Sequence, residues 1–548
     1  MAAHAPPEYR DNEVELESLA DPQTFEHPDS PLPLLEDSTR SRSPTPDATM
    51  DMAPKWMNTA QPWSRTFSQR LIALLRPRLA VGYIIWSLIG LYVLYCIIVR
   101  SPLFASKLPN YSGKYGVAAI DVEFPVQTPR KTSESVFKDG KPAFGLETVL
   151  FTLYYPAAKG VRGDRPRHHW IPKPVSLTAE GYARAAHFNN FISRPIFTFA
   201  LWAIAGSITI PAEVDVPLLP LDERVDEKFP VVVLSHGQAS SRTDYTHYCG
   251  ELASSGVMVA AVEHRDGSSP GSIVTTEAGE RRVMYLNKKE LIGGKEMEDD
   301  DFKFEQLAFR QAEIEETIAV LKTLNAGEGA DVFARNARNE GRDLQQWSNR
   351  LNFSQTVVAG HSLGATGALQ VLKGATSERN PAVGGIILDP GKSSGRLNTD
   401  IDVPILVVHS DSWSKKVSVF FGRPHFDTVR DIVKDVLKRV GSSWFLTSLK
   451  TSHPSVTDAP LIEPLLLRWT TGATINVNEG LREYVRVSME FLDFLRNGTR
   501  EGILSEGVTH KEYGEDTRTD EQKARMPKET TKYWQIHVAP PRDESGGK

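Results

Sequence analysis

The chain has few cysteines and no excess of positive charge, and these absences exclude several classes of protein. Its 548 residues include two cysteines, Cys96 and Cys249, which leave no disulfide framework and no cysteine-based zinc site. With 63 basic and 69 acidic residues the net charge is -6, and no long Lys/Arg run is present to follow a phosphate backbone. We therefore expect no nucleic-acid partner and a fold stabilised by its apolar core.

Metal-binding motifs are also absent. The sequence contains neither the HExxH pattern of zinc hydrolases nor the acidic loop pattern of calcium sites. We therefore expect a site that uses no metal and no cofactor.

The N-terminal region divides into a polar tail and an apolar run. Residues 1 to about 60 are rich in Pro, Ser, Asp and Glu without apolar periodicity, which predicts a disordered tail that extends to residue 78. Residues 79–99 carry no charge, and such a run is long enough for a membrane-spanning helix. A signal peptide is the alternative, but this run is longer than a typical signal core and lies far from the N-terminus. The sequence therefore predicts one transmembrane helix at 79–99.

Basic residues near this run predict its orientation. They are more numerous before it than after it: Arg65, Arg70, Arg76 and Arg78 precede it, and Arg100, Lys107 and Lys114 follow. This favours a single-pass membrane protein with a cytoplasmic N-terminus and a lumenal or extracellular C-terminal domain. The sequons at Asn110, Asn352 and Asn497 would then be open to glycosylation, as in a glycoprotein.

After residue 108, short β-type runs alternate with helical patterns. This alternation predicts an α/β fold at 108–500, with a mostly parallel sheet covered by helices on both faces. A polar tail is expected at 501–548. One amphipathic helix is expected between the third and fourth strands, at about 304–321. The expected strands are Val149 to Tyr155, Val231 to Ser235, Val257 to Val262, Thr356 to Ala359, Gly385 to Leu388 and Ile405 to His409.

A second apolar stretch at 195–210 is too short and too close to Pro195 for a typical spanning helix. It predicts a lid or an interfacial helix that directs Phe197, Phe199 and Trp202 toward lipid or a substrate channel. A buried core helix is the alternative.

The strongest chemical signal is a GxSxG pattern centred on Ser362. Further matches occur at 267–271 and 391–395. Only Ser362 follows a β-branched run and precedes a helix-forming stretch, as in the nucleophile elbow of the α/β-hydrolase fold. We therefore predict Ser362 to be a catalytic nucleophile.

A serine nucleophile needs a histidine base and a carboxylate, which follow it in this order: Ser, acid, His. His453 is favoured as the base because it lies in a loop directly after a late strand. The other histidines after Ser362 are less suited by position: His409 ends a strand, His425 lies in a polar segment before a helical pattern, and His510 and His537 lie in the charged tail.

Two acids follow expected strands at the carboxyl edge of the sheet, Asp389 and Asp411, and the pattern alone does not choose between them. Two backbone N–H groups should stabilise the tetrahedral intermediate. Leu363 follows the nucleophile and Gln238 lies in the loop after an early strand, so these residues are the expected oxyanion donors.

Several segments, in order, resemble the platelet-activating-factor acetylhydrolase family, meaning the plasma and type II enzymes, which are calcium-independent phospholipases A2. The resemblance covers roughly residues 110 to 500, and its most specific part is the block HGxxxxRxxY followed by AAVEHRD. The matching segments are TLYYPA (152–157), FPVVVLSHGQASSRTDY (229–245), LASSGVMVAAVEHRDGS (252–268), EQLAFRQAEI (305–314), VVAGHSLGATGALQ (357–370), GIILD (385–389) and TSHPSVTD (451–458).

This resemblance implies roles for particular residues. It implies Asp389 as the acid, with Asp411 as runner-up, and His453 as the base. It also places the oxyanion donors at Gln238 and Leu363. Gln238 departs from the residue more usual there, but a backbone donor need not depend on its side chain.

The implied activity is hydrolysis of a short or oxidised sn-2 acyl ester of a glycerophospholipid, as in 1-alkyl-2-acetylglycerophosphocholine esterases. The expected partners are the phospholipid substrate and membrane lipid. The alternatives are a general carboxylesterase or lipase of the same fold, and a catalytically inactive hydrolase fold that serves as a membrane scaffold.

Overall fold

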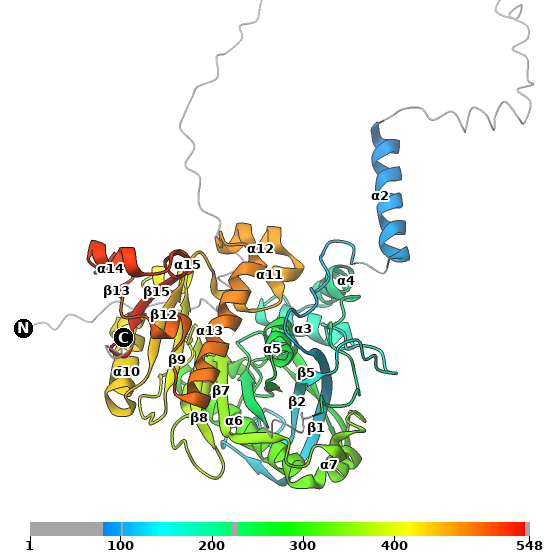
Figure 1. Cartoon of the computed structure of the whole chain (residues 1–548). Coiled ribbons are helices and arrows are strands. Elements are labelled where there is room, and N and C mark those ends of the chain that lie inside the picture. Colours follow the sequence, from blue (N-terminus) through cyan, green and yellow to red (C-terminus); the bar gives the residue numbers. More distant parts are fainter. Residues whose placement is uncertain (1–80, 100–101, 221–227, 543–548) are drawn as a thin grey trace, which may run out of the picture. The chain divides into compact units, whose positions relative to one another are not determined.

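A computed structural model describes residues 81–99, 102–220 and 228–542. Within these residues one central sheet has nine strands in the order β1-β2-β4-β3-β7-β8-β9-β12-β15 (Figure 1). The strands from β4 to β12 in this order pair in parallel, whereas β1, β2 and β15 pair antiparallel at the two sides. The strands are β1 (Gly116–Lys131), β2 (Gly145–Ala157), β3 (Phe229–Ser235), β4 (Met258–Glu263), β7 (Leu351–His361), β8 (Ala382–Leu388), β9 (Ile405–Ser410), β12 (Trp444–Ser448) and β15 (Trp534–Val538). The predicted α/β class with a mostly parallel sheet is confirmed.

Helices cover both faces of the sheet. Alternation along β3 shows why: Val231 and Val233 join one buried apolar cluster, and Val232 and Leu234 join another, because successive side chains of a strand point to opposite faces. Helices α6, α8 and α10 contribute to the first cluster, and α5 and α13 to the second. The main helices are α3 (Val175–Ala185), α4 (Ser193–Ala205), α5 (Thr246–Ser254), α6 (Asp299–Thr323), α7 (Gly329–Arg335), α8 (Leu363–Val371), α10 (His425–Val440), α12 (Pro464–Thr471) and α13 (Val477–Asn497).

Shorter elements complete the fold. They comprise three hairpins, β5–β6 (Gly271–Thr276, Gly279–Met284), β10–β11 (Val419–Phe420, Arg423–Pro424) and β13–β14 (His510–Glu512, Glu515–Asp516), and the short helices α9 (Asp411–Lys415), α11 (Ala459–Ile462), α14 (Asp520–Arg525) and α15 (Lys528–Tyr533). All six predicted strands coincide with strands of the sheet, and the predicted amphipathic helix lies within α6.

Helix α2 (Val81–Ile98) does not support the predicted transmembrane span. It has 18 residues, which at 1.5 Å per residue make about 27 Å, short of the roughly 30 Å of a hydrocarbon core. Across the described ranges, no helix combines the length and the apolarity needed to span a bilayer. The predicted span at 79–99 is therefore wrong, and so is the single-pass membrane localisation that depended on it. The predicted tail at 1–78 lies outside the described residues.

The C-terminal segment differs from the polar tail expected from residue 501 onward. Trp534–Val538 form β15, which pairs antiparallel with β12 and is buried throughout. Trp534 and Ile536 are 2% and 0% exposed. The polar residues around this strand hid its role, because five residues surrounded by charge give little periodic signal.

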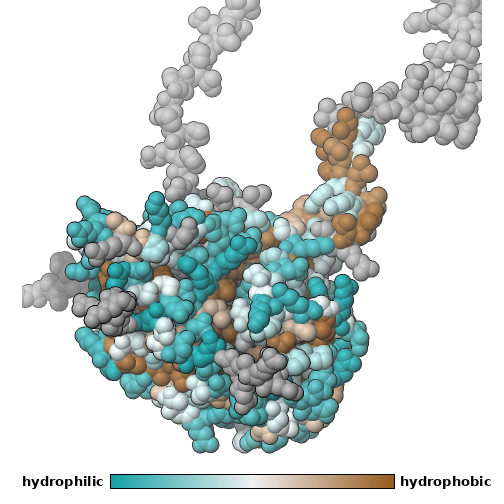
Figure 2. All heavy atoms as spheres, viewed as in Figure 1, coloured by the Kyte–Doolittle hydropathy of each residue, from teal (hydrophilic) through white to brown (hydrophobic). Residues whose placement is uncertain are grey.

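Most of the second apolar stretch lies in α4. Part of this helix is at the surface, since Ile196, Phe199 and Trp202 are 57 to 67% accessible, whereas Ala205 at its end is buried. Ile208 and Ile210, the last apolar residues of the stretch, are each 1% exposed and belong to the core. The lid and interfacial readings therefore remain predictions for the exposed part. In the view of Figure 2 the surface of the described residues 102–220 and 228–542 is mostly hydrophilic with scattered hydrophobic patches.

Candidate active site

Ser362 lies on a sharp turn between β7 and α8. Its backbone has φ 56° and ψ -125°, a strained conformation for a residue with a side chain. The flanking glycines permit this turn, because a Cβ on Gly360 would lie 2.1 Å from the Gly364 carbonyl oxygen, and one on Gly364 would lie 2.1 Å from that of Ser235. The other two GxSxG matches lie in loops between β4 and β5 and between β8 and β9. Of the three GxSxG serines, Ser362 is therefore the one that lies on a turn between a strand and a helix.

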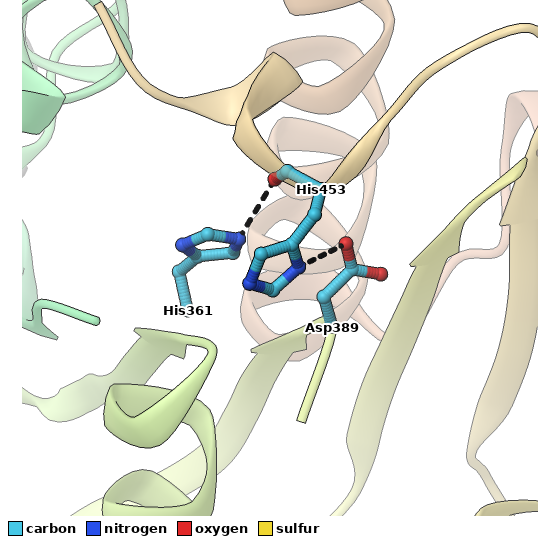
Figure 3. A group of neighbouring side chains, drawn as sticks. All are labelled: His361, Asp389 and His453. Carbon is cyan, nitrogen blue, oxygen red and sulfur yellow. Dashed lines mark hydrogen bonds and ion pairs between the residues drawn. The ribbon is translucent and has the colours of Figure 1, made fainter. Parts of the chain in front are cut away.

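Asp389 and His453 lie together at the carboxyl edge of the sheet (Figure 3). Asp389 directly follows β8, and His453 begins a short 3-10 helix after β12. His453 Nδ1 donates to Asp389 Oδ2 over 2.9 Å. Among the five histidines after Ser362, His453 is the one hydrogen-bonded to a carboxylate. The structure therefore brings two of the predicted residues into direct contact.

The two candidate acids differ in their partners. Asp389 is 2% exposed, and besides His453 it accepts hydrogen bonds from Ser410 N at 2.6 Å and Ser410 Oγ at 2.7 Å. These bonds hold a charged carboxylate in one orientation. Asp411 instead accepts from Tyr513 and from the backbone of Lys450. Asp389 is the acid positioned to orient His453.

Aromatic side chains surround the His453 ring. The Trp413 indole stacks on it with ring centroids 4.0 Å apart and planes inclined by 12°, and the His361 ring lies at 4.5 Å. Trp413 Nε1 donates to the Pro390 carbonyl oxygen, which fixes the indole. No hydrogen bond from Ser362 Oγ occurs within the described ranges, and such bonds are often long in ligand-free enzymes.

Tyr245 and His361 form a bridge that sequence reasoning missed. Gly237 N donates to Tyr245 Oη at 3.0 Å, Tyr245 Oη contacts His361 Nδ1 at 2.8 Å, and His361 Nε2 contacts the His453 carbonyl oxygen at 3.0 Å. Burial, with the nearby His453, lowers the pKa of His361 well below its usual value. The neutral ring therefore donates from Nε2 and accepts the Tyr245 proton at Nδ1.

This bridge gives physical content to the block HGxxxxRxxY. Its glycine, Gly237, leaves little room for a side chain, since a Cβ there would lie 3.2 Å from Ser362 Cβ. Its arginine, Arg242, is buried and pairs with Asp121 and Glu263. Its tyrosine is Tyr245. The block was the signal that could have identified this bridge, but spacing alone does not show which atoms meet.

The expected oxyanion donors lie on two segments beside Ser362. Leu363 is the first residue of α8, and the first N–H groups of a helix have no acceptor within the helix. Gln238 follows Gly237 in the loop after β3. Its side chain is held at both ends, since Nε2 donates to Tyr285 at 2.8 Å and Oε1 accepts from Lys303 at 2.7 Å.

His361, Asp389 and His453 could also be read as metal ligands, because one ligand atom from each lies within 4.8 Å of the others. The hydrogen bonds argue against that reading. Both ring nitrogens of His361 already have protein partners, and Nδ1 of His453 is bonded to Asp389. A metal would have to break these bonds, so the group fits acid–base chemistry better.

Comparison with known proteins indicates the family to which the chain is similar. The family model described as platelet-activating factor acetylhydrolase, isoform II, matches residues 104–501. The platelet-activating factor acetylhydrolase of Cavia porcellus is 28% identical over 287 residues, which are 50% of this chain and 59% of that protein. A putative phospholipase A2 of Schizosaccharomyces pombe is 31% identical over 283 residues, which are 48% and 58% of the two chains.

The matched part thus spans between half and three fifths of these relatives. A solved ferulic acid esterase from Streptomyces cinnamoneus aligns with 74% of this chain and 96% of its own at 18% identity and a TM-score of 0.46. Since the family match extends over most of the sequence, this chain belongs to the platelet-activating factor acetylhydrolase isoform II family.

Proposed function

We propose that the protein is a serine esterase that hydrolyses the short or oxidised sn-2 acyl ester of a glycerophospholipid. The observation that carries this proposal is the 2.9 Å bond between His453 and Asp389, next to the strained turn at Ser362, in a chain of this family. The names of the relatives support a phospholipid substrate.

In the proposed first half-reaction, Ser362 Oγ attacks the ester carbonyl carbon while His453 Nε2 takes the hydroxyl proton. Asp389 keeps Nδ1–H in place and stabilises the imidazolium. The carbonyl oxygen becomes an oxyanion, which accepts from the backbone N–H groups of Gln238 and Leu363. The intermediate then breaks the bond to the lysophospholipid alkoxide, which receives the proton from His453. An acyl-enzyme is left.

In the second half-reaction water attacks the acyl carbon and gives its proton to His453. The second tetrahedral intermediate expels Ser362 Oγ, which recovers the proton. A small carboxylic acid leaves and the enzyme is regenerated. Every proton moves between groups of the chain, substrate and water.

The test compares full-length protein with Ser362→Ala, using 1-alkyl-2-acetylglycerophosphocholine and long-chain phosphatidylcholine with calcium chelated. We expect acetate release from the first lipid only, and its loss in Ser362→Ala. Ser393→Ala is the matched control, because Ser393 is the central serine of another GxSxG match and is exposed. This control should retain activity and fluorophosphonate labelling.

The alternatives give different results in the same assay. A general carboxylesterase would hydrolyse 4-nitrophenyl acetate through Ser362 but neither phospholipid. An inactive scaffold would hydrolyse no ester and would not be labelled by a fluorophosphonate.

A further inference from the structure

Hydrogen bonds fix two successive peptide units in the loop after β3. The His236 carbonyl oxygen accepts from Arg310 Nη1 at 2.6 Å, and the N–H of the same peptide unit, that of Gly237, donates to Tyr245. The C=O and N–H of a trans peptide point in opposite directions. Arg310 and Tyr245 therefore hold this unit from its two sides.

The next peptide unit is held by His236 itself. Burial and the nearby Arg310 lower the pKa of His236 to about 4, so its ring is neutral at pH 7. Its Nε2 accepts from the backbone N–H of His264 at 3.0 Å, which leaves the ring proton on Nδ1 to donate to the Gly237 carbonyl oxygen at 2.8 Å. With that oxygen held, the N–H of Gln238 must point to the opposite side.

Arg310, on α6, joins this loop to a neighbouring turn. Its side chain is 0% exposed, and its guanidinium group donates both to the loop after β3 and to the turn that holds Asp266 and Ser268. Nε donates to Asp266 at 2.8 Å, Nη2 to Ser268 Oγ at 2.5 Å, and Nη1 to Ser235 Oγ at 3.2 Å as well as to the His236 oxygen. Although burial opposes it, the Arg310 charge holds the pKa of Asp266 below its ordinary value.

A buried chain of hydrogen bonds extends from Arg310. Ser235 Oγ lies 2.7 Å from His264 Nε2, and His264 Nδ1 lies 2.7 Å from Glu313 Oε2. Burial and Arg310 lower the pKa of His264 well below its usual value, so the neutral ring accepts from Ser235 and donates to Glu313. The order serine, histidine, acid is that of a catalytic triad, but the three residues are at most 1% exposed. This series of hydrogen bonds therefore orients Ser235 and Arg310, and it lies away from any substrate.

We infer that Arg310 is a positioning residue that sets the oxyanion donor at Gln238 by fixing the His236–Gly237 peptide. This inference rests on the proposed esterase function. Arg310 acts through the loop and contacts no substrate. A lysine would keep the charge beside Asp266, but it cannot reproduce the planar fork that reaches Ser235, Ser268 and the His236 oxygen together.

The variant Arg310→Lys is expected to lower kcat on 4-nitrophenyl acetate by about 10- to 100-fold with KM nearly unchanged, since a small misplacement of transition-state groups has effects of this size. A trifluoromethyl ketone, which forms an oxyanion when Ser362 adds to it, should bind more weakly by a similar factor. A merely structural role would leave this affinity unchanged in the folded fraction.

Arg265→Lys is the matched control. Arg265 is also a buried arginine, but its side chain pairs with Glu123 and donates to Thr148, away from the loop. We expect it to lower the melting temperature while kcat per folded molecule and inhibitor affinity stay at the wild-type values.

The outcomes separate the inference from the proposed function. If the wild type hydrolyses the ester and Arg310→Lys keeps its kcat and inhibitor affinity, the inference alone is overturned. The same holds if Arg265→Lys loses as much kcat and inhibitor affinity as Arg310→Lys does. A wild type without ester turnover would overturn both. If Arg310→Lys does not fold, Ser235→Ala decides, because it removes one acceptor of Arg310 without a charge change and should lower kcat and inhibitor affinity together.

Discussion

The Tyr245 hydroxyl links the loop after β3 to the His361 ring, and this ring contacts the loop of His453. Tyr245→Phe would leave the Gly237 N–H and His361 Nδ1 buried without a partner, which costs about 1–3 kcal/mol for an unsatisfied group. We expect a lower melting temperature together with a kcat reduced by about tenfold, because both loops lose their common support.

Tyr248→Phe tests whether this effect belongs to the site. Tyr248 is a buried tyrosine whose hydroxyl contacts Ser488 at 2.7 Å, outside the site. Its loss should lower stability without changing kcat. Equal losses of kcat in the two variants would argue against the bridge.

Some residues of the site could be predicted from the sequence, and others could not. Ser362 stood out because the elbow needs glycines at two fixed positions and a strand before it. The choice between Asp389 and Asp411 needed either the family resemblance or the structure, because both acids follow a strand and a periodic pattern does not show which one faces His453. Tyr245, His361 and Arg310 depend on which atoms meet across long separations, and no local pattern contains that information.

The turn between β7 and α8 needs a close approach of backbone to backbone. Gly364→Ala would place a methyl group 2.1 Å from the Ser235 carbonyl oxygen, and neither segment can move without disturbing the site. We expect a loss of about 3 kcal/mol or more, measured by urea unfolding, and little remaining activity. Gly145→Ala is the control, because its Cβ would lie 3.7 Å from Pro142. A stable, active Gly364→Ala would show that the turn can relax.

Strand β15 supports the strand that leads to His453. Ile536 pairs with Leu446 of β12 and is fully buried. Ile536→Ala is therefore expected to destabilise the protein by about 2–5 kcal/mol. Val508→Ala, at a position 40% exposed, should change stability by less than about 0.5 kcal/mol. Similar unfolding midpoints for both variants would mean that β15 contributes little.

Elements with unusual patterns were the ones that the sequence did not predict. β1 carries Asp121 and Glu123, which look like surface residues in a sequence but are paired with Arg242 and Arg265 in the fold. In β15, His537 is buried against Thr447. Strands rich in Val and Leu and free of charge, such as β3, were predicted at nearly their true bounds because their burial needs no partner charges.

At the scale of the whole molecule, buried histidines predict acid sensitivity. Burial lowers the pKa of eight of them, to about 4 for His236 and His247, about 3 for His425 and His537, well below the usual value for His264, His361 and His409, and below the usual value for His510. Between these values and about 6.5 the unfolded chain binds more protons than the folded one. This contribution to stability is therefore complete above pH 6.5 and is lost as the pH falls toward 4.

Carboxyl groups whose pKa is raised by desolvation oppose this trend but are fewer: Asp244, Glu313, Asp458, Glu463 and Glu490. We expect the free energy of unfolding to fall by roughly 2 kcal/mol per pH unit between pH 6.5 and 5, as measured by urea unfolding. It should vary less between pH 8 and 9, where these histidines are neutral in both the folded and the unfolded chain. A stability that is constant or rises toward pH 5 would contradict this balance.

The bridge through Tyr245 and His361 also constrains how the molecule is assembled. Its two long-range bonds join residues 116 and 92 positions apart in the chain. The first requires β3 and β7 to be paired in register, and the second requires β12 to be joined to β7 through β8 and β9. Contacts of such high sequence separation are formed late, because the entropy of closing the intervening chain must be overcome first. A nascent or partly folded chain would therefore hold a serine and a histidine without the geometry that activates them, and catalytic competence would arise only with the last step of folding.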